Sequence, residues 1–270
     1  MRHHLDLSNS QFKIQKIFHS FKPATGAGFD PLPRRLTALA LGLVLNAFGN
    51  GITISSNIGT APWGASEVNL AHIFHISIAL AMFLTGFLVA VVNQLLLRHF
   101  DLPRFLGEVV FIAGFSYFIQ LFTTLFSALG LPRLPLTWRL AVGLLGIMTL
   151  GCSISFYQRA NLIMHPNDDT TNILRFMYCR NKVIRAQLLN FSVPVLITGI
   201  CWLISGKVYA VNLGTLLCIL VNGPMIALAD HWLWHSLHHN ITAPKAISDR
   251  DLLTQRLQFV WSRFLVPNSP

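Results

Sequence analysis

The sequence has few charged residues and no cysteine pattern typical of a disulfide or zinc framework. Asp, Glu, Lys and Arg make up 11% of the 270 residues, whereas soluble proteins carry about 25%. The four cysteines form no C-x-x-C pair and have no regular spacing. A Walker motif, a G-x-S-x-G motif, a dinucleotide fingerprint and a complete set of metal ligands are also missing. We therefore expect no soluble domain, no disulfide-stapled fold, no enzyme and no cofactor.

The residues that are abundant are apolar. Hydrophobic residues make up 53% of the chain, which indicates an integral membrane protein whose main partner is the lipid bilayer. The net charge of +10 would on its own suggest a nucleic-acid partner. We expect no nucleic-acid binding, because so few charges cannot solvate the surface of such an apolar domain.

Six stretches are long and apolar enough to cross a hydrocarbon core about 30 Å thick, which takes about 20 helical residues. The fold class is therefore an all-α, polytopic membrane helix bundle with about six transmembrane helices. Glu108 and Arg139 are the only Asp, Glu, Lys or Arg residues inside these stretches. The predicted spans are 36–56, 77–97, 105–127, 138–156, 186–205 and 209–229.

The distribution of Lys and Arg predicts the orientation of the spans. With the N-terminus inside, only Arg133, Arg139 and Lys207 of the 20 basic residues lie outside. Basic residues are enriched on the cytoplasmic side of membrane proteins. We therefore expect a multi-pass protein of the bacterial inner membrane with both termini in the cytoplasm.

Three regions follow from this topology. Residues 1–35 form a basic cytoplasmic segment, residues 36–230 the transmembrane domain, and residues 231–270 a cytoplasmic tail. Within the tail, 248–264 reads as an amphipathic helix with apolar residues toward the inner leaflet. Residues 5–21 show a weaker pattern of the same kind.

The second half of the membrane domain repeats features of the first. Leu-Ala-Leu-Gly at 39–42 recurs as Leu-Ala-Val-Gly at 140–143, and Leu-Gly at 106–107 recurs at 213–214. These matches divide the domain into repeats 36–127 and 138–229, each with three spans. An odd number of spans places the repeats in opposite orientations, so we predict an inverted repeat, a plan common among secondary transporters.

In each repeat, a proline marks a connection that is too long and too apolar for a simple loop. Pro62 precedes 64–75 and Pro166 precedes 167–178, and both stretches read as short helices. A helix of about 12 residues is roughly 18 Å long and cannot span a membrane. Two interpretations remain open: interrupted half-helices that enter the membrane, or amphipathic helices on its surface.

Three motifs stand in order along the chain. They are Ile58-Gly59-Thr60-Ala61-Pro62-Trp63, His165-Pro166-Asn167-Asp168, and Gly214-Thr215 followed by Gly223-Pro224. On these residues the chain resembles the YczE-like branch of the YczE/YyaS/YitT group of bacterial membrane proteins. Gly64 and His165 depart from that group, which has Asp and Gly there. The resemblance implies a multi-span fold and a permease without a defined substrate.

The candidate site lies around the two predicted short helices. Asp168 and Asp169, with His165 beside them, are candidates for proton or cation coupling, the alternative being stabilisation of a helix start. The uncapped start around Gly64 favours an anion, so a carboxylate or phosphate is one hypothesis for the solute. The candidate substrate-binding residues are Asn50, Pro62, Trp63, Gly64, Ser66, Pro166, Asp168, Asp169 and Asn222.

Alternative roles stay open for several polar residues. Asn46, Asn50 and Asn222 lie within spans, where amides usually join helices and lining a polar path is the alternative. Trp63 is equally typical of an interfacial anchor. For Glu67 and Glu108 an interfacial position is favoured over a buried one. One face of a helix would carry His231, His235 and His238 or His239. At these residues, a segment that ends the last span at the membrane surface is favoured over a metal site.

The combined features predict a small-solute transporter or permease of unknown substrate. A different class, a non-transporting accessory or sensor protein that acts through a partner, is the alternative. A membrane metalloenzyme ranks third, and a homodimer is left open.

Overall fold

The computed structural model describes residues 30–240, and within that range every regular element is helical. Six helices are long and apolar enough to cross a membrane, so the prediction of a six-span helical membrane bundle is confirmed. They are α2 (Leu32–Ser55), α4 (Ile78–Leu97), α5 (Leu102–Ala128), α6 (Leu136–Ala160), α8 (Val183–Ser205) and α9 (Leu213–Trp232). Their ends lie within a few residues of the predicted limits.

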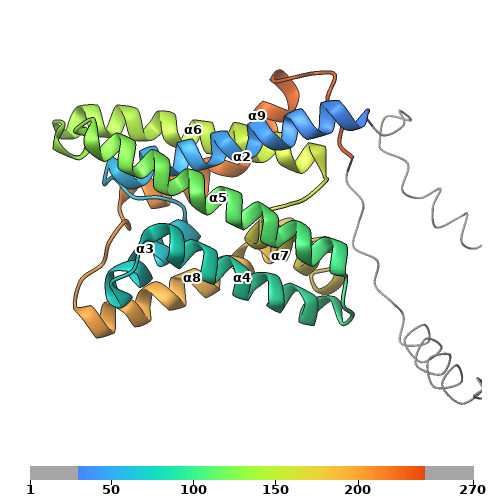
Figure 1. Ribbon diagram of the computed structural model, residues 1–270, viewed down its shortest axis with the longest axis horizontal. Helices are drawn as coiled ribbons and strands as arrows, with labels where there is room; N and C mark the ends of the chain where they lie inside the picture. Colours follow the sequence, from blue (N-terminus) through green and yellow to red (C-terminus); the bar gives the residue numbers. More distant parts are fainter. Residues whose placement is uncertain (1–29, 241–270) are drawn as a thin grey trace, which may run out of the picture.

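Three shorter elements complete the described range. They are α3 (Pro62–Phe74), the 3-10 turn η1 (Leu131–Arg133), and α7 (Pro166–Ile173), which continues as the π-helical turn η2 (Leu174–Tyr178). The two short helices predicted after Pro62 and Pro166 are therefore present. In Figure 1, α3 lies toward one end of the bundle and α7 toward the other.

The helix starts follow from local sequence. Ser77 caps α4 by accepting a hydrogen bond from the Leu80 N–H at 3.2 Å, and Asp101 does the same for α5. Asn212 and Thr215 form a capping box at α9. Because these side chains satisfy N–H groups that a helix start leaves unpaired, α4, α5 and α9 begin at defined residues.

The outer faces of the spans are apolar. Leu95, Ile184, Leu203 and Leu220 are each more than 70% exposed. Exposed apolar area of this kind is unfavourable in water, but it suits contact with lipid chains. The bundle surface thus matches the bilayer that the composition predicts.

Helices α2 and α6 cross closely at glycines. A Cβ atom added to Gly49 would lie 2.8 Å from the Gly146 carbonyl oxygen, and one added to Gly146 would lie 3.0 Å from the Gly49 oxygen. Small residues at membrane helix crossings let backbones approach in this way. In Figure 1, α5 lies beside this pair, and α3, α4, α7 and α8 form the layer below.

The two short helices lie inside the bundle. Helix α3 contacts α4, α8 and α9, and α7 contacts α4, α5 and α8. Nine residues of α3 are buried, among them every residue from Pro62 to Asn69. A helix on the membrane surface would expose one face, so the burial of α3 supports the interpretation that it enters the bundle.

The two ends of the described range meet at the same end of the bundle. Asp30 accepts hydrogen bonds from the His238 backbone N–H at 2.7 Å and from Asn240 Nδ2 at 3.1 Å. Burial raises the pKa of Asp30, but these bonds and those from the His238 ring and Arg34 outweigh it and lower the pKa to about 2. Arg159 is fully buried and donates to the carbonyls of Leu233, Trp234 and Leu237.

Two predictions on individual residues are corrected. Glu67 and Glu108 are buried, with 3% and 1% of their surface exposed, so neither is interfacial. The helical face expected for the tail histidines does not form, because α9 ends at Trp232 and the chain then turns. His238 bonds to Asp30, and His239 lies 3.3 Å from Asp230. The predicted amphipathic segments 5–21 and 248–264 lie outside the described residues.

Candidate functional site

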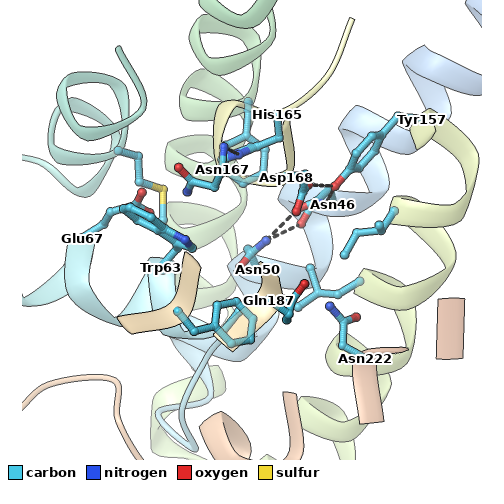
Figure 2. Close-up of a pocket in the computed structure, with 17 residues that line it drawn as sticks. Asn46, Asn50, Trp63, Glu67, Tyr157, His165, Asn167, Asp168, Gln187 and Asn222 are labelled. Carbon is cyan, nitrogen blue, oxygen red and sulfur yellow. Dashed lines mark hydrogen bonds between the residues drawn. The ribbon is translucent and has the colours of Figure 1, made fainter. Parts of the chain in front are cut away.

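A polar cavity of about 90 Å³ lies between the two short helices and the surrounding spans (Figure 2). That volume holds several water molecules or one small solute. Eight helices contribute to its wall, α7 only through its start. They are α2, α3, α4, α5, α6, α7, α8 and α9. The residues that line it are Asn46, Asn50, Ala61, Trp63, Gly64, Glu67, Met82, Phe115, Leu150, Ile154, Tyr157, His165, Asn167, Asp168, Gln187, Phe191 and Asn222.

Helix α2 contributes two amides that are one turn apart. Asn50 Nδ2 donates to Asn46 Oδ1 at 2.8 Å, and Thr60 Oγ1 donates to Asn50 Oδ1 at 3.3 Å. The Asn46 amide in turn lies 3.5 Å from the Tyr157 hydroxyl. This chain of bonds fixes the orientation of the α2 amides and links them to α6.

The Tyr157 hydroxyl donates a hydrogen bond to the Asp168 carboxylate. Burial raises the pKa of Asp168, the bond from Tyr157 lowers it, and the nearby charge of Asp169 raises it again, to about 6. In Figure 2, Asp168 lies among the labelled side chains, between Tyr157 on one side and Trp63 and Glu67 on the other. The pKa of Asp168 at the wall of the cavity is therefore closer to neutral pH than that of an ordinary aspartate.

His165 lies just before α7 and caps it. Its Nδ1 accepts a hydrogen bond from the Asn167 N–H at 3.3 Å. The imidazole ring packs edge-on against the Phe115 ring, with 4.9 Å between the ring centroids. Burial lowers the pKa of His165 to about 3, so the imidazole is neutral at physiological pH. The structure thus places this residue at the cavity as a hydrogen-bonding group without a charge.

Glu67 lies one helical turn after Trp63 on α3. Its Oε1 is buried without a hydrogen-bond partner, and burial raises the pKa of Glu67 well above its usual value. Trp63 Nε1 donates to Asn190 Oδ1 at 3.3 Å, and Asn190 Nδ2 donates to the Asn167 carbonyl at 2.9 Å. A single amide of α8 therefore ties α3 to α7.

A second cavity of about 260 Å³ lies on the other side of α7, beside the start of α5. Arg104 and Asp169 line it and form two hydrogen bonds of 2.5 Å, one from Nε and one from an Nη atom. Glu108 also lines it: Oε1 accepts from Asn93 Nδ2 at 3.0 Å, and Oε2 has no partner. The adjacent carboxylates Asp168 and Asp169 therefore face different cavities.

The structure brings together six of the predicted site residues. Asn50, Trp63, Gly64, His165, Asp168 and Asn222 all line the central cavity. The other four do not line it. Pro62 lines a separate apolar cavity, and Ser66 donates a hydrogen bond to the Trp63 carbonyl. The Pro166 carbonyl accepts hydrogen bonds from Asn93 and Thr170, and Asp169 pairs with Arg104.

Three polar residues of the cavity were not predicted: Tyr157, Asn167 and Gln187. Glu67 was placed at an interface, although a sequence signal for its position existed. Glu67 follows Trp63 by four residues, so the two side chains share a face of a helix that begins at Pro62. For Tyr157 and Gln187 the sequence offers no signal, because each lies near one end of its helix among other polar residues, such as Gln158 and Arg185.

Two of the sequence motifs meet at the loop before α3. The Gly214 N–H donates to the Ile58 carbonyl at 2.7 Å, and the Thr60 N–H donates to the Ala210 carbonyl at 3.1 Å. Gly59 has a φ of +104°, and a Cβ atom there would lie 2.8 Å from the Thr215 nitrogen. Only glycine fits this close approach, which fixes where Pro62 starts α3 beside α9.

Residues 33–231, about three quarters of the chain, match the family model described as Family of unknown function (DUF6198). The chain belongs to this family. No curated protein and no solved structure matches the chain.

Proposed function

We propose that this multi-pass membrane protein is a small-solute transporter whose substrate site is the central cavity between α3 and α7. The main support for this proposal is the cavity itself. There, two short helices from opposite ends of an apolar bundle bring polar side chains together. Polar and ionisable groups inside a membrane bundle are costly, and they usually mark a solute or ion pathway. Broken helices at matching positions are typical of transporter sites.

We propose further that the two halves of the bundle form an inverted repeat. The contacts support this, because they recur in the same order: α2 with α5 and α6 with α9, then α3 with α8 and α7 with α4. In each half, one long helix precedes the short helix and two follow it. A transporter of this plan exposes its site by rocking one half against the other.

In this proposal Asp168 is the coupling carboxylate. It lines the cavity, and its pKa of about 6 lets it lose and regain a proton near physiological pH. Asp169 forms a bidentate pair with Arg104 and supports the fold instead. His165, neutral at this pH, serves as a hydrogen-bonding wall residue.

The orientation proposed from the basic residues places both termini in the cytoplasm of a bacterial cell. The turn between α4 and α5 then also lies inside, and the second cavity opens toward the cytoplasm. The resemblance of the three motifs to the YczE/YyaS/YitT group is consistent with a bacterial permease.

Reconstitution into proteoliposomes tests the proposal. Solutes are screened for currents on a solid-supported membrane, with the wild type, Asp168→Asn and Asp101→Asn. Asp101→Asn is the matched control, because it removes a carboxylate outside the central cavity while asparagine still caps α5. We expect a solute current that Asp168→Asn abolishes and Asp101→Asn retains. No current with any solute, together with co-purification of a protein partner, would favour the accessory or sensor role.

A further inference from the structure

We infer that the central cavity binds a small organic cation with N–H donors, and that this cation and a proton compete for Asp168. The inference names the substrate class of the site and therefore rests on the proposed function. The uncapped start of α3 favours an anion as the ligand. The inference instead assigns a ligand of the opposite charge to the cavity.

The fully buried, unpartnered side-chain atoms of the lining residues are hydrogen-bond acceptors. Glu67 Oε1, Asn167 Oδ1 and Asn222 Oδ1 belong to residues that line the cavity, and none of the three has a partner. Glu67 and Asn167 are more than nine-tenths buried. A buried acceptor without a donor costs about 1–3 kcal/mol. A ligand that carries N–H groups removes this cost, whereas a ligand that carries only acceptors does not.

The charges of the residues that line the cavity also favour a cation. Two carboxyl groups, Glu67 and Asp168, line the cavity, and none of the lining residues in the described range is Lys or Arg. The nearby Arg104 is engaged by Asp169 in the other cavity. A helix start contributes about 0.3–1 kcal/mol toward an anion, which is too little to hold one beside Asp168.

The titratable groups that face Asp168 come from several elements. From α6 Tyr157 donates to it, from the start of α7 neutral His165 lies beside it, and from α3 Glu67 faces the same cavity. Asp169 and Arg104 act from the far side of α7. The remaining helices contribute amides and apolar side chains: Asn46, Asn50, Met82, Phe115, Gln187, Phe191 and Asn222.

The exchange conserves charge at the site. With its pKa of about 6, Asp168 is mostly ionised at neutral pH, so a monovalent cation pairs with this carboxylate. At lower pH a proton binds the same carboxylate oxygen, and the cation leaves without its counter-charge. The only covalent change is the O–H bond of Asp168. Trp63, Phe115 and Phe191 supply ring surfaces that also attract cations.

Calorimetric titration of the purified full-length protein tests the inference. Methylammonium is the cation with N–H donors, tetramethylammonium the cation without them, and acetate the anion. We expect methylammonium to bind at pH 7 and about tenfold more weakly at pH 5, because Asp168 with a pKa of about 6 changes from mostly ionised to mostly protonated. Tetramethylammonium should bind at least about tenfold more weakly than methylammonium because it offers no donor to the wall acceptors, and acetate should not bind.

Two variants refine the test. Asp168→Asn should weaken methylammonium binding and remove its pH dependence, while Asp101→Asn changes neither. Tyr157→Phe removes the hydrogen bond that lowers the pKa of Asp168, so the midpoint of the pH dependence should move to higher pH. This second variant still gives a result if Asp168→Asn does not fold.

The outcomes separate the inference from the proposed function. Acetate binding without methylammonium binding, or methylammonium binding that is equal at pH 5 and pH 7, overturns the inference. Methylammonium binding in detergent without any flux in proteoliposomes supports the ligand class and overturns the transporter. Flux of anions alone would leave the transporter and overturn the cation.

Discussion

Replacing Asp169 by asparagine should destabilise the protein more than the same change at the adjacent Asp168. The Asp169 carboxylate is 5% exposed and accepts two hydrogen bonds from Arg104. Asparagine keeps the shape but loses the charge and one acceptor oxygen. Arg104 then stays in the protein without its counter-ion.

The magnitude follows from how much of Arg104 water can reach. Removing one partner of a fully buried ion pair costs about 3–5 kcal/mol. The Arg104 side chain is 23% exposed, and Glu108 lines the same cavity. Both features reduce the penalty, so we expect Asp169→Asn to cost about 2 kcal/mol, somewhat less than a fully buried pair would.

Thermal unfolding in detergent, followed by tryptophan fluorescence, measures this cost. A loss of about 2 kcal/mol lowers Tm by several degrees in a domain of this size. Asp101→Asn and Asp168→Asn should change Tm much less. A double-mutant cycle with Arg104→Gln isolates the pair, and we expect a coupling energy of at least about 1 kcal/mol. Additive effects of the two substitutions would refute the role given to this pair.

Two further predictions concern the fold. Gly49→Ala should destabilise the bundle by about 1–3 kcal/mol, because the added methyl group meets the Gly146 carbonyl oxygen at 2.8 Å; the matched change Gly199→Ala, with nothing within 4 Å of the new atom, should not lower Tm. Equal Tm values for the two variants would contradict the close crossing of α2 and α6. Asp30→Asn should remove about 1–2 kcal/mol at neutral pH, because the pKa of about 2 in the folded protein lies below the ordinary value of 3.8. That contribution is present above about pH 4 and is lost as the pH falls toward about 2, so acid unfolding curves of Asp30→Asn and wild type should converge there; a constant gap in Tm across this range would argue against it.

The spans and the short helices could be predicted because their signals are local. Runs of apolar residues set the length of each span, and Pro62 and Pro166 mark where α3 and α7 begin. The polar residues Asn50 and Asn222 could be identified as candidates because they interrupt apolar stretches. These features depend on neighbours in the chain, which the sequence displays directly.

The remainder of the site depends on contacts between distant segments. Asp168 and Asp169 look like a pair in the sequence, but successive residues of a helix point about 100° apart. They therefore face separate cavities, and only the distant Arg104 and Tyr157 show which role each takes. Glu67 has the polarity of an interfacial residue, and its burial follows from α8 packing over α3.

The most direct test of the transporter proposal is solute flux into proteoliposomes that contain the full-length protein. The flux is compared between the wild type and Asp168→Asn. We predict uptake of methylammonium driven by an outward proton gradient, its loss in Asp168→Asn, and its retention in Asp101→Asn. Uptake that is unchanged by Asp168→Asn in a folded protein would contradict the claim that the central cavity is the substrate site.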